Sequence, residues 1–267
     1  MNFSVVMSVY VKDVADYLQQ ALDSLINQTL LPSEIIIVSD GPLTENLYEV
    51  IDNFIEHHEN SLHIKCPVNK GPANAWNLGV AESGYDWIAR MDADDICLPD
   101  RFEKQIAYLT DNPQVALLGG AISEFDTDPD MVKNNRNVPT SLREIVSLSK
   151  KRNPFNHVTV MFNKQAYLAA GKYIQITGFV DYYLWVRMLN DEIIAHNLDS
   201  VLVKVRVGND MVGRRIGINY AKSEFEFNFE TYKIGFFSFR EAFRNILLRC
   251  SFRLLPRKFV SWMYSLR

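Results

Sequence analysis

The chain has 267 residues, of which 48% are hydrophobic and 12% aromatic, enough for one packed domain with an appendage. Its three cysteines form no CxxC pair and make a poor disulfide framework, and no apolar run approaches the roughly 20 residues of a membrane-spanning helix. The net charge of −4 is uneven: residues 233–267 hold eight basic residues and one acidic residue, a net +7, which leaves −11 for the rest. The first ten residues lack the basic region and cleavage site of a signal peptide, so we expect a cytosolic or peripheral membrane protein.

The first 120 residues alternate between strand and helix patterns. Residues 3–9 form a nearly continuous apolar run rich in β-branched residues, which is typical of a strand buried on both faces of a parallel sheet. Further strands are predicted at 34–38, 62–66, 87–91 and 115–118, and helices at 15–26, 44–57, 73–82 and 99–109. The less regular second half predicts helices at 141–150 and 181–190 and strands at 157–162 and 200–207. This order indicates an α/β fold with a mostly parallel sheet.

Three polar signals follow predicted strands: Asp40, the turn at residues 69–71, and the acidic cluster Asp92-Ala93-Asp94-Asp95. Ligands of open α/β sheets bind beyond the carboxyl ends of the strands. We therefore expect these three signals to lie at one edge of the sheet and to form one site.

The acidic cluster has two interpretations. Asp92 and Asp94 are separated by one residue, so in an extended chain both carboxylates point the same way and could bind Mg²⁺ or Mn²⁺ together with substrate phosphates. Such a metal would neutralise charge on a departing diphosphate. The alternative is a solvated acidic turn before the next helix.

Other single residues are equally open on the residues alone. Asp40 could accept a hydrogen bond from a uracil N–H or sit in an ordinary Asp-Gly turn. Asp181 stands among aromatic residues, where a raised pKa would suit a general base, but it could also be a helix N-cap. His157 could contact a metal or an acceptor, or it could be structural.

Five ordered segments resemble the inverting family 2 glycosyltransferases, whose nucleotide-sugar-binding fold is of the GT-A type. These are Ser4–Tyr10; Ser24–Thr29 with Pro32 and Glu34–Gly41; Asn69–Gly71 with Ala75 and Asn77; Met91–Asp95 with Pro99 and Arg101; and Gly178–Arg187. Each segment is unspecific alone, but their order across residues 3–187 is highly specific. This chain resembles the bacterial O-antigen and exopolysaccharide enzymes of this family in its length and in its C-terminal tail.

The resemblance implies a role for each matching residue. It places the UDP-sugar donor against Val9, Tyr10, Asp40, Asn69, Gly71 and Asp92, with Arg206 and Arg214 (of the Arg214-Arg215 pair) closing over the diphosphate. Asp94, with Asp92, would hold Mn²⁺ or Mg²⁺. The donor hexose or the acceptor would contact Asp95, His157 and Trp185, and Asp181 would deprotonate the acceptor hydroxyl.

Three positions depart from the family pattern. Ser39 stands where a first acid is usual, Val180 replaces a glutamate before the catalytic aspartate, and Tyr183 replaces a frequent aspartate. Ser39 and Val180 are the best support for one alternative, a catalytically degenerate nucleotide-sugar-binding module. A second alternative is a nucleotidyltransferase, which also places acids and Mg²⁺ beside a nucleotide, but residues 8–12 are not the glycine- and arginine-rich phosphate loop that it would favour. A dinucleotide enzyme is disfavoured because no GxGxxG follows the first strand.

The domain organisation follows from the charge pattern and the resemblance. We expect a catalytic domain over residues 1–232, with a nucleotide-sugar-binding half (1–120) and an acceptor and catalytic-base half (121–232). Aromatic and basic residues alternate over 233–267, which suits amphipathic helices on an anionic membrane, although a helix packed on the core is the alternative.

The resemblance also implies the substrates and the location. We expect a hexose, galactose or glucose, to pass from UDP to a lipid-linked sugar, giving a β-linkage in bacterial O-antigen or exopolysaccharide synthesis. The acceptor would be undecaprenyl-diphosphate GlcNAc or GalNAc at the inner face of the cytoplasmic membrane. No nucleic-acid partner is expected.

Overall fold

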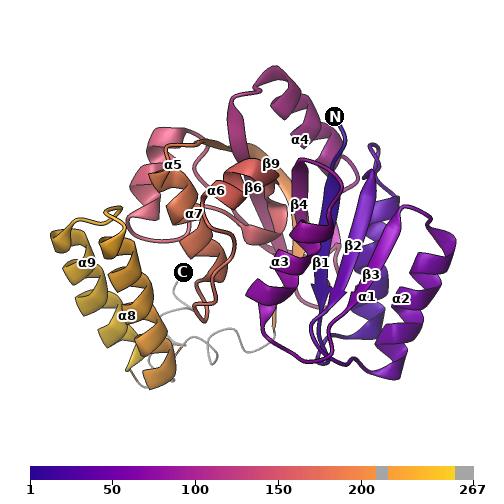
Figure 1. Ribbon diagram of the computed structural model, residues 1–267, viewed down its shortest axis with the longest axis horizontal. Coiled ribbons are helices and arrows are strands. Elements are labelled where there is room, and N and C mark those ends of the chain that lie inside the picture. Colours follow the sequence, from indigo (N-terminus) through magenta and orange to yellow (C-terminus); the bar gives the residue numbers. More distant parts are fainter. Residues whose placement is uncertain (209–215, 256–267) are drawn as a thin grey trace.

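A computed structural model describes residues 1–208 and 216–255 of the chain (Figure 1). Its centre is a nine-stranded sheet in the order β3-β2-β1-β4-β8-β6-β9-β5, with β7 paired to β6. The strands are β1 (Ser4–Val9), β2 (Glu34–Ser39), β3 (Ser61–Lys65), β4 (Trp87–Asp92), β5 (Ile96–Cys97), β6 (Val115–Phe125), β7 (Val132–Arg136), β8 (Met161–Asn163) and β9 (Ile194–Arg206). The expected α/β fold is confirmed.

Helices cover both faces of the sheet. On one face, Val5 and Met7 of β1 pack in a cluster with buried residues of α1 (Ala15–Ile26), α2 (Glu45–His57) and α4 (Arg101–Asp111). On the other face, Val6 packs in a cluster with buried residues of α3 (Pro72–Glu82), α5 (Leu142–Ser149), α6 (Lys164–Ala169) and α7 (Val180–Asn190). Because both faces of β1 are buried, its sequence is a continuous apolar run rather than an alternating one.

The sheet is parallel in its first half and mixed in its second. β3, β2, β1 and β4 are parallel, whereas β8 is antiparallel to both β4 and β6, and β6 is parallel to β9. The expected parallel arrangement is therefore found in the half of the sheet formed by β3, β2, β1 and β4, and the other half is mixed. Sequence analysis also missed β7 and α6.

The strand predicted at residues 157–162 is wrong in its first half. Residues His157–Thr159 form a 3₁₀ turn, and the strand β8 begins only at Met161. The hydroxyl of Thr159 donates to the carbonyl of Asn156 at 2.8 Å, and the Thr159 N–H donates to the same oxygen at 2.9 Å. These local bonds compete with a sheet ladder, although the apolar sequence suits a strand.

The C-terminal part is a helical hairpin, seen beside the sheet domain in Figure 1. It consists of α8 (Ile218–Lys233) and α9 (Phe239–Asn245), followed by a π-helical turn (Ile246–Cys250) and α10 (Ser251–Arg253). Phe227 of α8 packs on Phe179 and Tyr182 at ring distances of 4.8 and 4.5 Å, so the hairpin is docked on α7 and its preceding loop. The predicted boundary at residue 233 falls inside this hairpin, at the end of α8. None of the helices in the described ranges has the length and apolarity to cross a bilayer.

Candidate donor and acceptor site

The ends of three neighbouring strands bring the first polar signals together. In the register of the sheet, Val9 is opposite Ser39 of β2, and Ser8 is opposite Asp92 of β4. The N–H of Asp40 donates to the carbonyl of buried Val9 at 2.8 Å, so the chain leaves β2 directly beside the end of β1. One edge of the sheet thus holds Asp40 and Asp92, as the sequence predicts.

Asp40 orders the turn at residues 69–71. Its Oδ1 accepts a hydrogen bond from the Lys70 N–H at 2.9 Å, and the Asn69 Oδ1 accepts one from the Gly71 N–H at 3.1 Å. Gly41 has φ +90°, and a Cβ there would lie only 2.7 Å from the Asn69 nitrogen. A side chain at residue 41 would push the turn away, so glycine allows this close approach.

The serine that departs from the family pattern has a structural partner. Ser39 is fully buried, and its hydroxyl lies 2.7 Å from the Nε2 of His63 on the neighbouring strand. Burial, together with the charge of Lys65, lowers the pKa of His63. Ser39 thus makes a buried hydrogen bond to His63 at the position where the family pattern has an acid.

Asp92 forms an ion pair with a buried arginine, Arg90. The Arg90 Nη2 lies 3.3 Å from the Asp92 Oδ1, and the guanidinium of Arg90 lies over the Trp76 ring at 4.7 Å. Trp76 in turn donates from Nε1 to the Ser8 hydroxyl at 2.9 Å. The Asp92 side chain remains 37% exposed, so it is oriented by the protein and still accessible to a ligand.

Arg206, at the end of β9, donates hydrogen bonds to Asp94 and Asp95, the other two acids of the cluster. Its N–H donates to the Oδ1 of Asp95 at 2.8 Å, and its Nε donates to the carbonyl of Asp94 at 3.2 Å. Asp95 is buried, and burial followed by the charges of Asp94 and Asp92 raises its pKa well above the usual value. The guanidinium of Arg206 also lies over the Tyr17 ring, 3.8 Å from its centroid, so in this structure the side chain packs within the protein. Its predicted contact with the diphosphate stays a prediction.

A fifth carboxylate joins those of Asp40, Asp92, Asp94 and Asp95, and sequence analysis missed it. The Oδ2 of Asp13 accepts from the N–H of half-exposed Tyr10 at 2.9 Å. Burial raises the pKa of Asp13 to about 7, against the effect of this backbone hydrogen bond, and the charges of Asp94 and Asp92 raise it further. The available signal was an acid four residues beyond the end of the first strand, in the loop that follows that strand.

The carboxylates fit a divalent cation that takes most of its ligands from phosphate groups and water. Within residues 1–208 and 216–255, no group of three or more His, Cys, Asp or Glu side chains converges as a metal site. Mg²⁺ and Mn²⁺ sites in nucleotide enzymes commonly use one or two carboxylates, with phosphate and water oxygens as the remaining ligands. Asp92 and Asp94, both partly exposed, match that donor set.

Asp181 lies in the first turn of α7, on the other side of the site. The residue that caps this helix is Phe179, so the alternative of an N-cap aspartate is wrong. The Asp181 Oδ2 accepts from the Asn153 Nδ2 at 2.6 Å. Burial raises the pKa of Asp181, while hydrogen bonds from the Tyr182 N–H and Asn153, and the charge of Arg136, act in the opposite direction. A partly exposed carboxylate with a raised pKa and one fixed oxygen suits a general base.

A family model described as Glycosyl transferase family 2 matches residues 4–171, which is more than half of the chain. The chain belongs to glycosyl transferase family 2. This membership confirms the resemblance on which the residue roles were based and excludes the nucleotidyltransferase alternative.

Full-length relatives of this transferase come from bacteria. It is 40% identical over 265 residues to an uncharacterized glycosyltransferase of Haemophilus influenzae, covering 99% of this chain and 98% of the relative. It is 37% identical to the amylovoran biosynthesis glycosyltransferase AmsE of Erwinia amylovora, covering 98% of each chain. It is 34% identical to the UDP-Gal:alpha-D-GlcNAc-diphosphoundecaprenol beta-1,3-galactosyltransferase of Escherichia coli, covering 99% of this chain and 95% of the relative.

Solved structures share the fold at low sequence identity. The mannosyltransferase PcManGT of Pyrobaculum calidifontis, in complex with GDP-Man and Mn²⁺, matches with a TM-score of 0.68 and 14% identity, over 99% of this chain and 75% of that one. Residues 1–349 of TarS from S. aureus, in complex with UDP-GlcNAc, match with a TM-score of 0.67 and 14% identity, over 86% of this chain and 66% of that one. These matches show that the transferase has the GT-A type fold.

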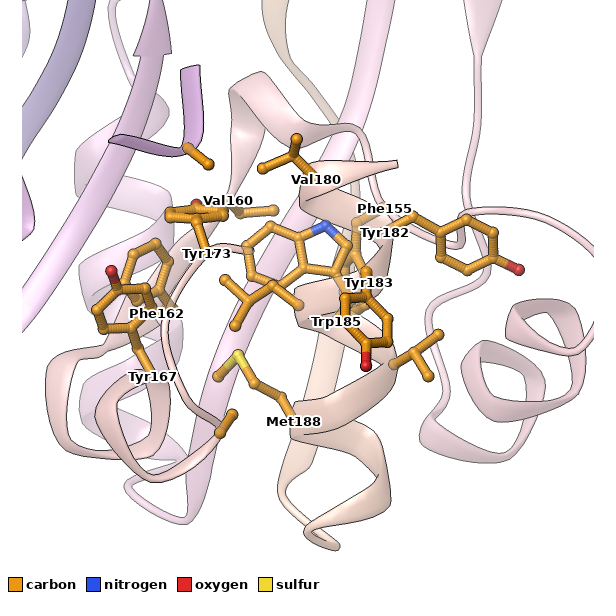
Figure 2. Packing of buried hydrophobic residues seen from close by; sticks show 14 of the residues in the cluster. Phe155, Val160, Phe162, Tyr167, Tyr173, Val180, Tyr182, Tyr183, Trp185 and Met188 are labelled. Carbon is orange, nitrogen blue, oxygen red and sulfur yellow. The ribbon is translucent and has the colours of Figure 1, made fainter. Parts of the chain in front are cut away.

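Of the residues predicted to face the sugar, Trp185 lies in the core, whereas the role of His157 stays a prediction. Trp185 is completely buried and packs against Phe155, Phe162 and Tyr173, as Figure 2 shows. His157 is partly exposed, and its Nε2 accepts from the Nε of Arg90 at 3.2 Å. Trp185 could contact a sugar only after repacking of this core. Arg214 lies outside the described residues.

Proposed function

We propose that this transferase moves a hexose from a UDP-sugar to a lipid-diphosphate-linked sugar with inversion at the anomeric carbon. One observation carries the proposal: the groups that support the donor-side and acceptor-side carboxylates lie in one segment, residues 153–157. His157 accepts from Arg90, which lies 3.3 Å from Asp92, and Asn153 donates to Asp181 at 2.6 Å. A donor held at Asp92 and an acceptor held at Asp181 would therefore meet beside this segment.

The roles of the chain's own residues follow from their surroundings. Asp40 and the turn at residues 69–71 would bind the uridine, with Val9 and Tyr10 lining the same edge. Asp92, oriented by Arg90, would bind the ribose or diphosphate side of the donor, and Asp95 would support the cluster near the sugar. Asp181, oriented by the hydrogen bond from Asn153 to its Oδ2, would take the proton of the acceptor hydroxyl.

The reaction is a single displacement. The acceptor hydroxyl oxygen attacks the anomeric carbon while the bond from that carbon to the UDP β-phosphate oxygen breaks. The hydroxyl proton passes to Asp181, and the configuration at the anomeric carbon inverts. Val180 replaces the usual glutamate before Asp181, so in this chain Asn153 and Arg136 are the side-chain groups that tune this carboxylate.

A divalent metal fits this scheme. Asp94, together with Asp92, would hold Mn²⁺ or Mg²⁺, with further ligands from the diphosphate. The bound metal would supply charge neutralisation to the departing UDP.

Relatives support the choice of substrates. The relative from Escherichia coli, 34% identical over nearly the whole chain, has a name that gives UDP-Gal as donor and GlcNAc-diphosphoundecaprenol as acceptor. We extend this to a UDP-hexose donor, galactose or glucose, and a lipid-linked GlcNAc or GalNAc acceptor, with a β-linkage. The amylovoran relative supports a place in O-antigen or exopolysaccharide synthesis.

The C-terminal hairpin supports peripheral binding at the inner face of the membrane. Exposed side chains recur at helical spacing on α8 (Phe225, Phe229, Tyr232) and along α9 and the π-helical turn (Phe239, Phe243, Leu247). The two rows meet where Tyr232 contacts Phe239 at a ring distance of 6.2 Å. We call these six residues the aromatic ridge. Apolar side chains beside basic residues are typical of helices that lie in a membrane interface.

The four arginines in the described part of the predicted tail form two groups. Arg249 and Arg253 both pair with the fully buried carboxylate of Glu224, so they hold the hairpin together. Arg240 and Arg244 are exposed beside the aromatic ridge and would face anionic lipid. Phe236 and Phe237 are buried, so part of the tail packs on the core, as the alternative interpretation expected.

A donor and acceptor screen tests the proposed function. The purified transferase is incubated with UDP-Gal, UDP-Glc, UDP-GlcNAc and GDP-mannose, each with Mn²⁺ or Mg²⁺ and an alkyl-diphosphate GlcNAc acceptor. We expect product with a UDP-hexose and a β-linkage in its NMR spectrum. An α-linked product would refute the inverting reaction, and no product with any UDP-sugar would refute the proposal and favour a degenerate binding module.

A further inference from the structure

The loop of residues 150–153 joins the acceptor-side carboxylate to the C-terminal hairpin. At one end, the Asn153 Nδ2 donates to Asp181 at 2.6 Å. At the other end, the carbonyl of Lys150 accepts from the Asn245 Nδ2 at 3.0 Å and from the Arg244 Nη2 at 3.4 Å. The carbonyl of Lys151 accepts from the Arg249 Nη1. This loop therefore spans the distance between the reaction centre and the helices of the aromatic ridge.

Two basic side chains of this loop point to solvent. Lys151 and Arg152 are exposed, and neither side chain has a hydrogen-bond or ion-pair partner in the described part of the chain. Lys150 differs, since its ammonium lies over the Phe236 ring at 3.8 Å and 4.0 Å from the Glu241 carboxylate. Lys150 thus anchors the loop, while its two neighbours offer unused positive charge.

A cavity of about 390 Å³ adjoins these two side chains. Lys151 and Arg152 line it on one side, and residues 137–139 line it on the other, immediately after Arg136. Arg152 precedes Asn153, whose amide donates to Asp181 at 2.6 Å, so this side of the cavity is adjacent in the chain to the partner of the acceptor-side carboxylate. One acid also lines the cavity: Glu144, which accepts a hydrogen bond from the Ser141 hydroxyl at 2.6 Å. With Lys151 and Arg152 the lining still has a net positive charge.

We propose that Lys151 and Arg152, with this cavity, bind the diphosphate of the lipid-linked acceptor. The inference rests on the proposed function, because it assigns the acceptor of that reaction to a site. Guanidinium and ammonium groups are the side chains that bind phosphate oxygens most strongly. The diphosphate then lies between its two attachments: the sugar reaches Asp181 along Asn153, and the lipid reaches the aromatic ridge along Arg244 and Arg249.

Matched acceptors and a double variant test the assignment. The variant is Lys151→Gln with Arg152→Gln, and the acceptors are GlcNAc-diphosphate on a short alkyl chain and the same alkyl GlcNAc without phosphate. We expect the variant to raise KM for the diphosphate acceptor at least about tenfold, the effect of losing one good charged contact. We expect KM for the phosphate-free acceptor and for the UDP-sugar to change less than about twofold, a difference too small to reflect a lost contact.

The control variant removes the same charge elsewhere. Lys65→Gln with Lys104→Gln changes two exposed lysines that pair only with the exposed carboxylates of Asp52 and Asp100, so it should leave both acceptor KM values unchanged. Equal KM values for the two acceptors in the wild type, or an equal rise for both in the variant, would overturn the diphosphate site while the transferase function stands. No transfer by the wild type to either acceptor would instead refute the proposed function, and this inference with it.

Discussion

The Nε of Arg90 donates a hydrogen bond to the Nε2 of His157 at 3.2 Å, and the Nη2 of the same arginine lies 3.3 Å from Asp92. His157 must be neutral to accept this bond, and burial, followed by the charge of Arg90, lowers its pKa well below the usual value. The proton of the imidazole is then on Nδ1, which has no partner among the described residues. His157 thus orients Arg90, and Arg90 orients the carboxylate that faces the donor.

The first prediction follows from this relationship. Changing His157→Ala removes the acceptor of the Arg90 bond, so we expect KM for the UDP-sugar to rise about tenfold, because a buried charged donor loses its partner. KM for the acceptor should stay the same. His196→Ala is the control, since His196 stacks on Tyr108 at 4.7 Å and has no contact with Arg90. Steady-state kinetics that show a changed acceptor KM and an unchanged donor KM would assign His157 to the acceptor, as the family resemblance implied.

Asp181→Asn should separate binding from chemistry. Asparagine keeps the size of the side chain and its bond to Asn153, but it cannot take the acceptor proton. We expect the rate of transfer to fall about a thousandfold, within the usual range for loss of a general base, while UDP binding measured by calorimetry stays unchanged. Substantial residual turnover in this variant would rule out Asp181 as the base.

Removal of the divalent metal should abolish transfer, and added Mn²⁺ or Mg²⁺ should restore it. In Asp94→Asn we expect the metal to lose most of its effect on UDP affinity, because one carboxylate of the pair becomes neutral. The measurement is UDP titration with and without Mn²⁺, in the wild type and in the variant. Metal-independent transfer after dialysis against EDTA would contradict the proposed metal site.

Asp13 should make the metal-free protein less stable as the pH rises. The pKa of Asp13 is raised to about 7 in the folded state, from 3.8, so the folded protein binds a proton that the unfolded chain has lost. Between these two values the free energy of unfolding falls with rising pH, by at most about 1.4 kcal/mol per pH unit. In Asp13→Asn this contribution should vanish, and the midpoint of thermal unfolding should fall less between pH 4.5 and pH 7. Parallel pH profiles for the two proteins would show that Asp13 ionises normally.

The aromatic ridge should decide membrane binding. Truncation at residue 234 would also remove buried Phe236 and Phe237, so exposed residues make a cleaner test. We expect the triple change Phe239→Ser, Phe243→Ser and Leu247→Ser to weaken binding to vesicles rich in anionic lipid at least about tenfold in a sedimentation assay, because large apolar side chains leave the interface. The matched control changes three exposed apolar residues elsewhere, Leu31→Ser, Leu62→Ser and Met131→Ser. Equal losses in both variants would show general hydrophobicity rather than a docking face.

The sequence by itself determined the fold of the first half and named the candidate donor-side residues. The apolar runs of β1 and β2 and the acids that follow β2 and β4 are local signals, because a strand buried on both faces and its polar end are visible within a few residues. Order along the chain then assigned Asp40, Asp92, Asp94 and Asp181 to one family pattern. The family match covers the first three of these residues, and the role of each stays a prediction.

Only the tertiary structure decided which residues support that site. Arg90 is 67 residues from His157 along the chain, Asn153 is 28 residues from Asp181, and Arg206 is 111 residues from Asp95. No periodicity or short motif encodes such pairs, because they depend on how β4, β8 and β9 come together in the sheet. The position of Trp185 also depends on the tertiary structure. In the sequence it is an aromatic residue near the predicted base, but it lies in the core because α7 is buried on several sides. Local chemistry marks the groups that act, and long-range packing decides which groups hold them.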